Sequence, residues 1–274
     1  MAVTMADISK LRKMSGAGMM DCKNALQEAD NDFEKAMEII RKKGQAVAAK
    51  RSDRDASEGC VLAADNGDFA AIVALKCETD FVAKNADFIA LVQSFLDAAM
   101  DKKPASLEAL LALPLSDGRS IENHITDRIG ITGEKMELGF YEFVQGTATV
   151  SYIHPGNKLA TVVAFNQELE RQVARDIAMQ VAAMNPVSIT PEEVSQKVID
   201  LELDVAKDKA RQAGKPENML DRIAQGALQR FYKDFTLLQQ DFIKDSKITV
   251  LQYLQQQDKA LIVTAFKRVT LNLE

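Results

Sequence analysis

The hydrophobic pattern changes period at Glu58, and this change limits the possible folds more than any other feature of the sequence. Within residues 1–55, apolar residues recur at the three- and four-residue spacing of amphipathic helices. After Glu58, two short apolar runs, 60–64 and 69–75, are separated by a turn that contains Asn66-Gly67. Asn-Gly between two such runs is a strong signal for a tight antiparallel hairpin. The sequence therefore predicts an α+β fold with a helical module in front of an antiparallel sheet.

The N-terminal module is predicted to contain three short helices followed by a charged linker. Ser15-Gly16-Ala17-Gly18 breaks the first helical stripe, because glycine permits sharp turns. Asp30-Asn31-Asp32 has the composition of a turn and an N-cap before the third helix. This helix is expected to end at Gly44, with an extension through residues 46–49 as the alternative. In the second helix, the spacing favours a core position for at least one of Met19 and Met20.

The rest of the chain is predicted to contain two related halves, residues 56–145 and 146–274. Each half follows the order strand, strand, long helix, helix, strand, and this repeat rests on element order rather than on residue identity. The expected strands are 60–64, 69–75 and 135–144, then 147–154, 158–165 and 261–271; the expected helices are 88–100, 107–113 and 120–129, then 167–184 and 249–257.

An insertion of two helices interrupts the second half at about 190–235. Thr190-Pro191-Glu192-Glu193 is typical of a helix start, with a capping residue, proline at the first position and acids in the first turn. Gly214-Lys215-Pro216 turns the chain back. Two helices of roughly 20 residues would extend for about 30 Å. From the residues alone, this hairpin either folds against the core or projects as an arm.

The charge and hydropathy of the chain argue against nucleic-acid and membrane partners. The net charge is −6, whereas phosphate backbones are bound by clustered lysine and arginine. No apolar run approaches the roughly 20 residues that span a bilayer. The N-terminus has neither the apolar core of a signal peptide nor the profile of a transit peptide. We therefore expect a cytoplasmic protein.

Residues for metal binding and bond chemistry are few. Cys22, Cys60 and Cys77 are odd in number and show no C-x-x-C spacing, so we expect buried thiols rather than disulfides or a zinc site. His124 and His154 lie far apart in sequence, and nothing in their spacing supports a Cys/His catalytic pair. The chain has no phosphate-binding or dinucleotide-binding glycine motif. No cofactor is expected, and any nucleotide would belong to a partner.

An acidic residue and a large aromatic residue stand where the second predicted strand gives way to a helix, in the run Glu78 to Lys84. Such junctions lie at the surface and often carry function. In one interpretation, Thr79 or Asp80 caps the helix and Phe81 belongs to the core. In the other, Asp80 and Phe81 contact a partner. General frequencies favour the first interpretation.

Two motifs resemble the elongation factor Ts family. The first is the T-D-F-V signature at Thr79, Asp80, Phe81 and Val82, where the family run matches from Cys77 to Lys84 and departs at Ala74 and Lys76. The second is L-R-x-[ST]-G-A-G-M-M-D-C-K-x-A-L, matched by Leu11-Arg12, residues 15–23, Ala25 and Leu26. The element order also agrees with the family along essentially the whole chain.

The resemblance implies a ubiquitin-associated-like N-terminal module, two related α+β subdomains and a protruding coiled-coil arm. It implies a nucleotide exchange factor without bond chemistry of its own. The partner would be elongation factor Tu, in its GDP-bound and nucleotide-free forms, whose Mg²⁺ and phosphate site is disturbed so that GDP leaves and GTP rebinds. This chain would bind no nucleotide directly.

The resemblance also implies which residues contact the partner. The exchange motif comprises Thr79, Asp80, Phe81 and Val82; the N-terminal module contributes Gly16, Ala17, Gly18, Met19 and Met20; and Thr132 and Gly133 would lie on the phosphate side. Thr132 replaces a family isoleucine, and Gln225-Gly226-Ala227 stands where Glu-Gly-Arg is common. The chain ends at Glu274, whereas many members continue with a C-terminal helical module, so we expect reliance on the core and the N-terminal module.

Three other classes remain open from the residues. The three-helix module could serve a general adaptor that binds a peptide or a ubiquitin-like protein. An enzyme would need a site built on Cys/His or Asp. A structural dimer could be formed through the helical hairpin.

Overall fold

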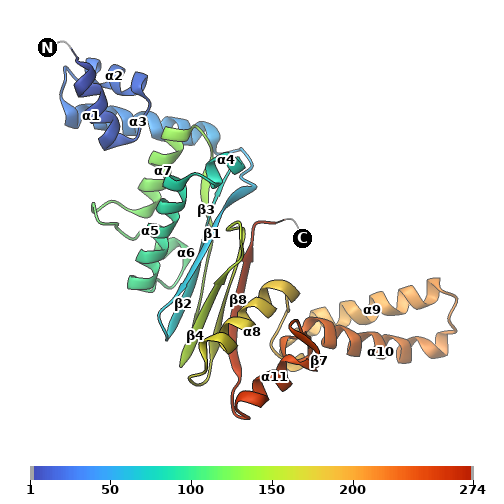
Figure 1. Ribbon diagram of the computed structural model, residues 1–274. Helices are drawn as coiled ribbons and strands as arrows, with labels where there is room; N and C mark the ends of the chain where they lie inside the picture. Colours follow the sequence, from blue (N-terminus) through green and yellow to red (C-terminus); the bar gives the residue numbers. More distant parts are fainter. Residues whose placement is uncertain (1–2, 273–274) are drawn as a thin grey trace.

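Two three-stranded antiparallel sheets form the centre of the computed structural model, which describes residues 3–272 (Figure 1). The first sheet has the order β1 (Glu58–Asp65), β2 (Phe69–Cys77) and β3 (Met136–Gln145); the second has the order β4 (Ala148–Ile153), β5 (Leu159–Phe165) and β8 (Val263–Thr270). The second strand is central in both sheets, so the two sheets share a strand order as well as the predicted element order. The predicted hairpin is also confirmed, because β1 and β2 pair antiparallel from Glu58 opposite Cys77 to Asp65 opposite Ala70.

The two sheets pack face to face through small apolar side chains. Val61 and Ile72 of the first sheet and Val162 of the second belong to one buried cluster, with several alanines between them. The outer faces of the sheets are covered by helices, so β2 and β5 are buried on both faces along nearly their whole length. This double burial explains why both strands read as continuous apolar runs instead of alternating ones.

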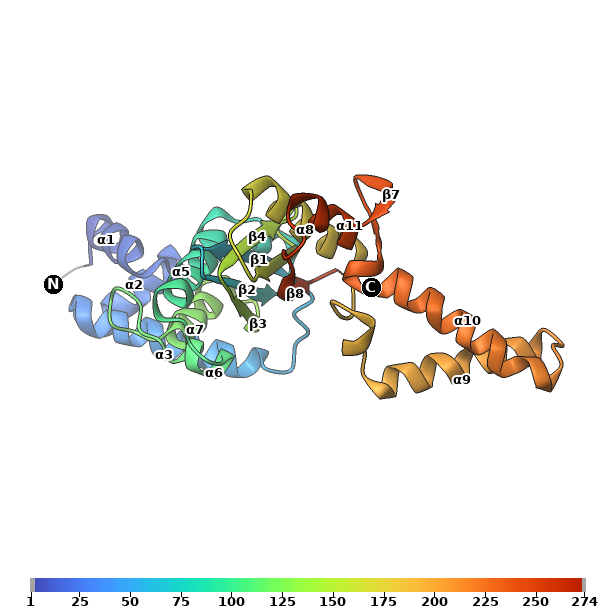
Figure 2. The same ribbon diagram turned by 90° about the horizontal axis from the view of Figure 1, so that it is seen from below.

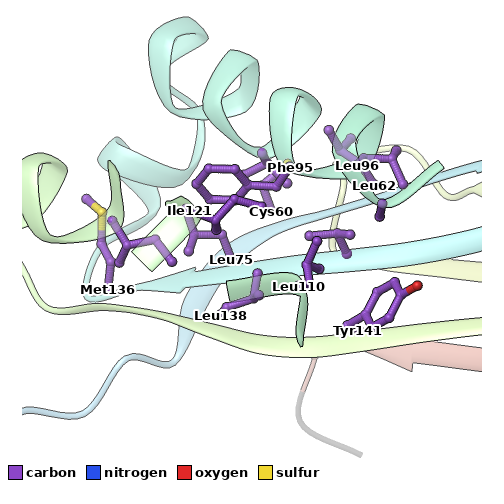
Figure 3. Packing of buried hydrophobic residues seen from close by; sticks show 14 of the residues in the cluster. Cys60, Leu62, Leu75, Phe95, Leu96, Leu110, Ile121, Met136, Leu138 and Tyr141 are labelled. Atoms are coloured by element: carbon purple, nitrogen blue, oxygen red, sulfur yellow. The ribbon is translucent and has the colours of Figure 1, made fainter. Parts of the chain in front are cut away.

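Helices cover the outer faces of both sheets. α5 (Ala86–Lys102), α6 (Leu107–Leu111) and α7 (Ile121–Thr132) lie over the first sheet, and α8 (Arg171–Met184) and α11 (Val250–Gln257) lie over the second. Figure 3 shows Phe95 and Leu96 of α5 above Leu62 and Leu75 of the sheet. Within residues 3–272, no helix combines the length and apolar character required to cross a membrane.

The N-terminal module consists of α1 (Met5–Ser15), α2 (Met19–Glu28) and α3 (Phe33–Arg51) around a small core of its own. Asp32 caps α3, as predicted, with its carboxylate accepting from two backbone N–H groups. The prediction that this helix ends at Gly44 is wrong, whereas the alternative of an extension through residues 46–49 is confirmed, because α3 continues to Arg51. Gly44 is buried against Gly130 of α7, so its lack of a side chain serves a helix crossing rather than a helix end.

The insertion projects from the body as an antiparallel pair of helices, α9 (Gln196–Gln212) and α10 (Glu217–Phe235) (Figures 1 and 2). Pro191 begins only the short 3₁₀ turn η1 (Pro191–Glu193), and α9 begins five residues later than the sequence signal indicates. Ala210, Leu220, Ala224 and Leu228 are buried along the pair.

Three further elements have no counterpart in the sequence prediction: η2 (Leu237–Gln239) and the two-stranded hairpin of β6 (Asp241–Phe242) and β7 (Asp245–Thr249). Tertiary contacts hold this hairpin. Phe242 stacks on Tyr253 with ring centroids 4.1 Å apart. The buried carboxylate of Asp176 accepts hydrogen bonds from Lys244 Nζ at 2.7 Å and from Tyr253 Oη at 2.9 Å. Strands this short do not show a detectable period.

The crossing of α3 and α7 yields an asymmetric prediction. A Cβ added at Gly130 would lie 2.5 Å from Gly44 Cα, whereas one added at Gly44 would lie 3.5 Å from Gly130 Cα, an ordinary contact. We expect Gly130→Ala to lower the free energy of unfolding by about 1–3 kcal/mol, because backbone atoms would have to separate. Gly44→Ala is the matched control and should be neutral or gain up to about 1 kcal/mol of helix propensity. Thermal unfolding of both variants checks this; equal effects would contradict the close crossing.

The cysteines give a second prediction. All three are free and buried, as expected from the sequence. Burial raises the pKa of Cys60 to about 11 and that of Cys77 to about 12, so little thiolate is present at neutral pH. We expect iodoacetamide at pH 8 to alkylate these two thiols at least about 100-fold more slowly in the native protein than in guanidinium chloride. Peptide mass spectrometry measures both rates, and equal rates would show that these thiols are accessible and ionise as in an unfolded chain, which contradicts their burial.

Candidate functional site

The strand-to-helix junction contains a one-turn helix, α4 (Asp80–Ala83), that the sequence prediction did not separate from the long helix. Thr79 caps α4, and its Oγ1 accepts from the backbone N–H of Val82 at 3.4 Å. The long helix α5 has its own cap, Asn85, whose side-chain oxygen accepts from Asp87 N at 2.9 Å. The capping role predicted for Thr79 is therefore confirmed for α4, while neither Thr79 nor Asp80 caps α5.

Phe81 points away from the core. Phe81 is 83% exposed, the highest exposed fraction among the exposed large hydrophobic residues of the described chain. The interpretation of Phe81 as a core residue is therefore wrong. Its neighbours hold the turn in place, because Ala83 is buried and Val82 packs against the core of the first sheet. Phenylalanine, tyrosine and tryptophan are enriched at protein–protein interfaces relative to the rest of the surface, so the ring is available for such a contact.

Asp80 lies beside the exposed ring and remains available to solvent. Its carboxylate accepts a hydrogen bond from Lys84 Nζ at 2.7 Å, one helical turn away. This hydrogen bond holds the pKa of Asp80 below its ordinary value, so the group is ionised at neutral pH. Both partners are well exposed, and exposed pairs of this kind exchange readily for other partners.

Glu134 clamps the junction to the turn that comes after α7. Its carboxylate accepts two hydrogen bonds from Thr79, from the backbone N at 3.1 Å and from Oγ1 at 2.7 Å. Its own backbone N donates to Thr132 Oγ1 at 3.2 Å. Gly133 closes α7 in the left-handed conformation, with φ of 73° and a bond from its N to Ile129 O. The Glu134 carboxylate thus brings together two groups of residues that are predicted to contact the partner, 79–82 and 132–133.

Glu78 makes a second link at the same junction. Its carboxylate accepts from the backbone N of Lys135 at 2.6 Å and from the Arg51 guanidinium at 3.4 Å. Arg51 is the last residue of α3, which leads from the N-terminal module toward α4 (Figure 1). The sequence prediction did not identify Glu78 or Glu134 as structural supports. A single carboxylate in a turn gives no signal of the partner that the fold supplies.

The predicted residues of the N-terminal module lie at the turn between α1 and α2. Gly16 ends α1 with φ of 70°, and Ala17 is buried. Met19 and Met20 are 42% and 64% exposed, so the expectation that at least one of them is a core residue is wrong. The reason is the orientation of α2, which buries Cys22, Ala25 and Leu26 and leaves the first turn facing solvent; exposed methionines of this kind form adaptable contact surfaces.

The site offers recognition groups rather than reactive ones. An exposed ring and an ionised carboxylate stand on a short helix that is held by buried contacts and by two glutamate links. Among residues 3–272, no group of three or more histidine, cysteine and acidic side chains is arranged to hold a metal ion. The arrangement is suited to docking against another protein.

Comparisons with known proteins identify the family. The family model described as elongation factor TS matches residues 78–272. The elongation factor Ts of Porphyromonas gingivalis is 72% identical over 274 residues, and that of Azobacteroides pseudotrichonymphae is 54% identical over 275, with the whole of each chain covered. The elongation factor Ts of Bacteroides thetaiotaomicron is 47% identical over 331 aligned positions, again with both chains fully covered. The chain therefore belongs to the elongation factor Ts family, the nucleotide exchange factors of translation elongation.

Proposed function

We propose that this chain binds elongation factor Tu in its GDP-bound and nucleotide-free forms, in the cytoplasm, and accelerates GDP release. The observation that carries the mechanism is the 83% exposure of Phe81 beside an ionised Asp80. The ring enters an apolar pocket of the partner and displaces the segment that holds the Mg²⁺ ligands. Asp80 exchanges Lys84 for polar partners near that site. Neither side chain forms or breaks a covalent bond.

The energy required sets the size of the contact. An acceleration of about 10⁴-fold corresponds to about 5.5 kcal/mol of preference for the nucleotide-free partner. Burying one phenylalanine side chain supplies about 1.5–3 kcal/mol. The remainder comes from a wider interface, for which we propose Met19 and Met20 on the module and Thr132-Gly133 beside the exchange motif. Such an interface would exceed about 2,000 Å² in total.

The coupling between the two binding events is reciprocal. If this protein weakens GDP binding to the partner by a given factor, GDP weakens the binding of this protein by the same factor. A rigid support serves this purpose, because a wedge that moved freely would lose part of its binding energy in becoming ordered. Glu134 and Glu78 fix the turn that carries the wedge.

Removal of the ring tests the wedge directly. We expect Phe81→Ala to slow catalysed GDP release roughly ten- to hundredfold, the equivalent of the lost burial, with an unchanged melting temperature because the ring is exposed. Release of a fluorescent GDP from the cognate elongation factor Tu measures the rate. Phe140→Ala is the control, since this residue is also exposed but lies on β3 away from the motif. An unchanged rate in Phe81→Ala would refute the wedge.

The clamp can be tested through its dependence on the ring. Glu134→Ala removes the two carboxylate oxygens that accept from Thr79, so α4 becomes mobile and exchange slows. At about 1 kcal/mol per hydrogen bond, the expected loss reaches about thirtyfold. In a Phe81→Ala background the same substitution should have little further effect, because the clamp acts by positioning the ring. Fluorescent GDP release from all four combinations gives the coupling. Independent, multiplicative effects would show that Glu134 acts elsewhere.

A further inference from the structure

A cleft of about 470 Å³ lies at the joint between the N-terminal module and the core. α1 and α3 form one wall, and α5, α7 and the loop before α7 form the others. We call it the joint cleft and define it by Arg41 of α3, Asp87 of α5, Asp117 and Arg119 of the loop, and Asp127 and Arg128 of α7. Its volume is in the range of small-molecule sites, and it is distinct from the exposed turn that carries Phe81.

Two arginines of this cleft, Arg41 and Arg128, have no carboxylate partner within residues 3–272. Nε of Arg128 is buried and has no hydrogen-bond acceptor among the described residues. A buried donor without an acceptor is unfavourable, and for a charged group the penalty is larger. The guanidinium of Arg128 is therefore poised to bind an acceptor that enters the cleft.

Two of the three aspartates of the cleft already accept hydrogen bonds from neighbouring groups. Asp127 accepts from the Arg119 guanidinium at 2.6 Å. Asp117 accepts from His124 Nε2 at 3.0 Å and from the backbone N of Arg119 at 3.0 Å. Asp87 is exposed at the first turn of α5. The hydrogen bond from His124 offsets the charge of Asp117 only when the imidazole is protonated, so the three arginines and three aspartates that line the cleft balance in formal charge. An anion is favoured instead by the unsatisfied donors, because Arg128 Nε is buried without an acceptor and neither Arg41 nor Arg128 has a carboxylate partner in the part of the chain that the structure describes.

We propose that the joint cleft binds a small oxyanion, a phosphate or carboxylate group, between Arg41 and Arg128. A planar guanidinium matches either group through two parallel N–H···O hydrogen bonds. Met14, Met37 and Leu91 line the same cleft and give an apolar wall for the organic part of such a ligand. Because Arg41 belongs to the module and Arg128 to the core, a bound anion links the two parts.

Calorimetric titration of the full chain tests this proposal without elongation factor Tu. The probes are inorganic phosphate, pyrophosphate and succinate, each at constant ionic strength maintained with chloride. We expect saturable binding of at least one probe to one site, with at least tenfold weaker binding in Arg128→Gln and in Arg41→Gln. Arg222→Gln is the control, an exposed arginine of α10 outside the cleft, and should bind as the unaltered protein does.

The affinities for the three probes show whether the joint cleft binds an oxyanion and of which kind. Tighter phosphate or pyrophosphate binding identifies a phosphate site, and tighter succinate binding identifies a carboxylate site; either supports the proposal. Arg41 is exposed, so its substitution leaves folding intact even where Arg128→Gln lowers the melting temperature. Saturable binding that all three variants weaken equally, or an absence of saturable binding to every probe, would overturn it.

Discussion

The face-to-face packing of two antiparallel sheets is the constraint on which the rest of the molecule depends. Alanine and valine on the inner faces allow the sheets to approach, and the outer faces must then be covered by helices. β2 is buried on both faces up to Cys77, where the chain leaves the sheet. The turn with Asp80 and Phe81 comes directly after this point, so it is anchored to the most rigid part of the fold.

The short helix that carries the exposed Phe81 ring is held in place by its neighbours. Val82 and Ala83 bury the inner side of α4, while Glu134 and Glu78 tie the turn to the segment after α7 and to the end of α3. Removing a large aromatic side chain from the core forfeits hydrophobic stabilisation, so the fold keeps Phe81 in solvent only because its neighbours supply the local stability. This separation of support from contact is typical of sites that act by docking.

The N-terminal module is connected to the core by more than a linker. α3 crosses α7 at Gly44 and Gly130 and runs unbroken to Arg51, whose guanidinium donates to Glu78 beside the turn that carries Phe81. Movement of the module would therefore disturb the same junction that carries Phe81. The joint cleft lies along this connection, so an anion bound between Arg41 and Arg128 would act on how the module sits against the core.

The sequence alone determined the α+β class, the first hairpin, the repeated element order and the helical insertion, because periodicity and turn residues act locally. A motif shared with a family also predicts a contact site at the junction of strand and helix, and this stays a prediction. Tertiary structure decided the rest. Whether Phe81, Met19 and Met20 face the core or solvent depends on which side of α4 and α2 is covered by other elements. The continuation of α3 through Gly44, the β6–β7 hairpin and the Glu134 clamp all depend on partners distant in sequence, which no local pattern can specify.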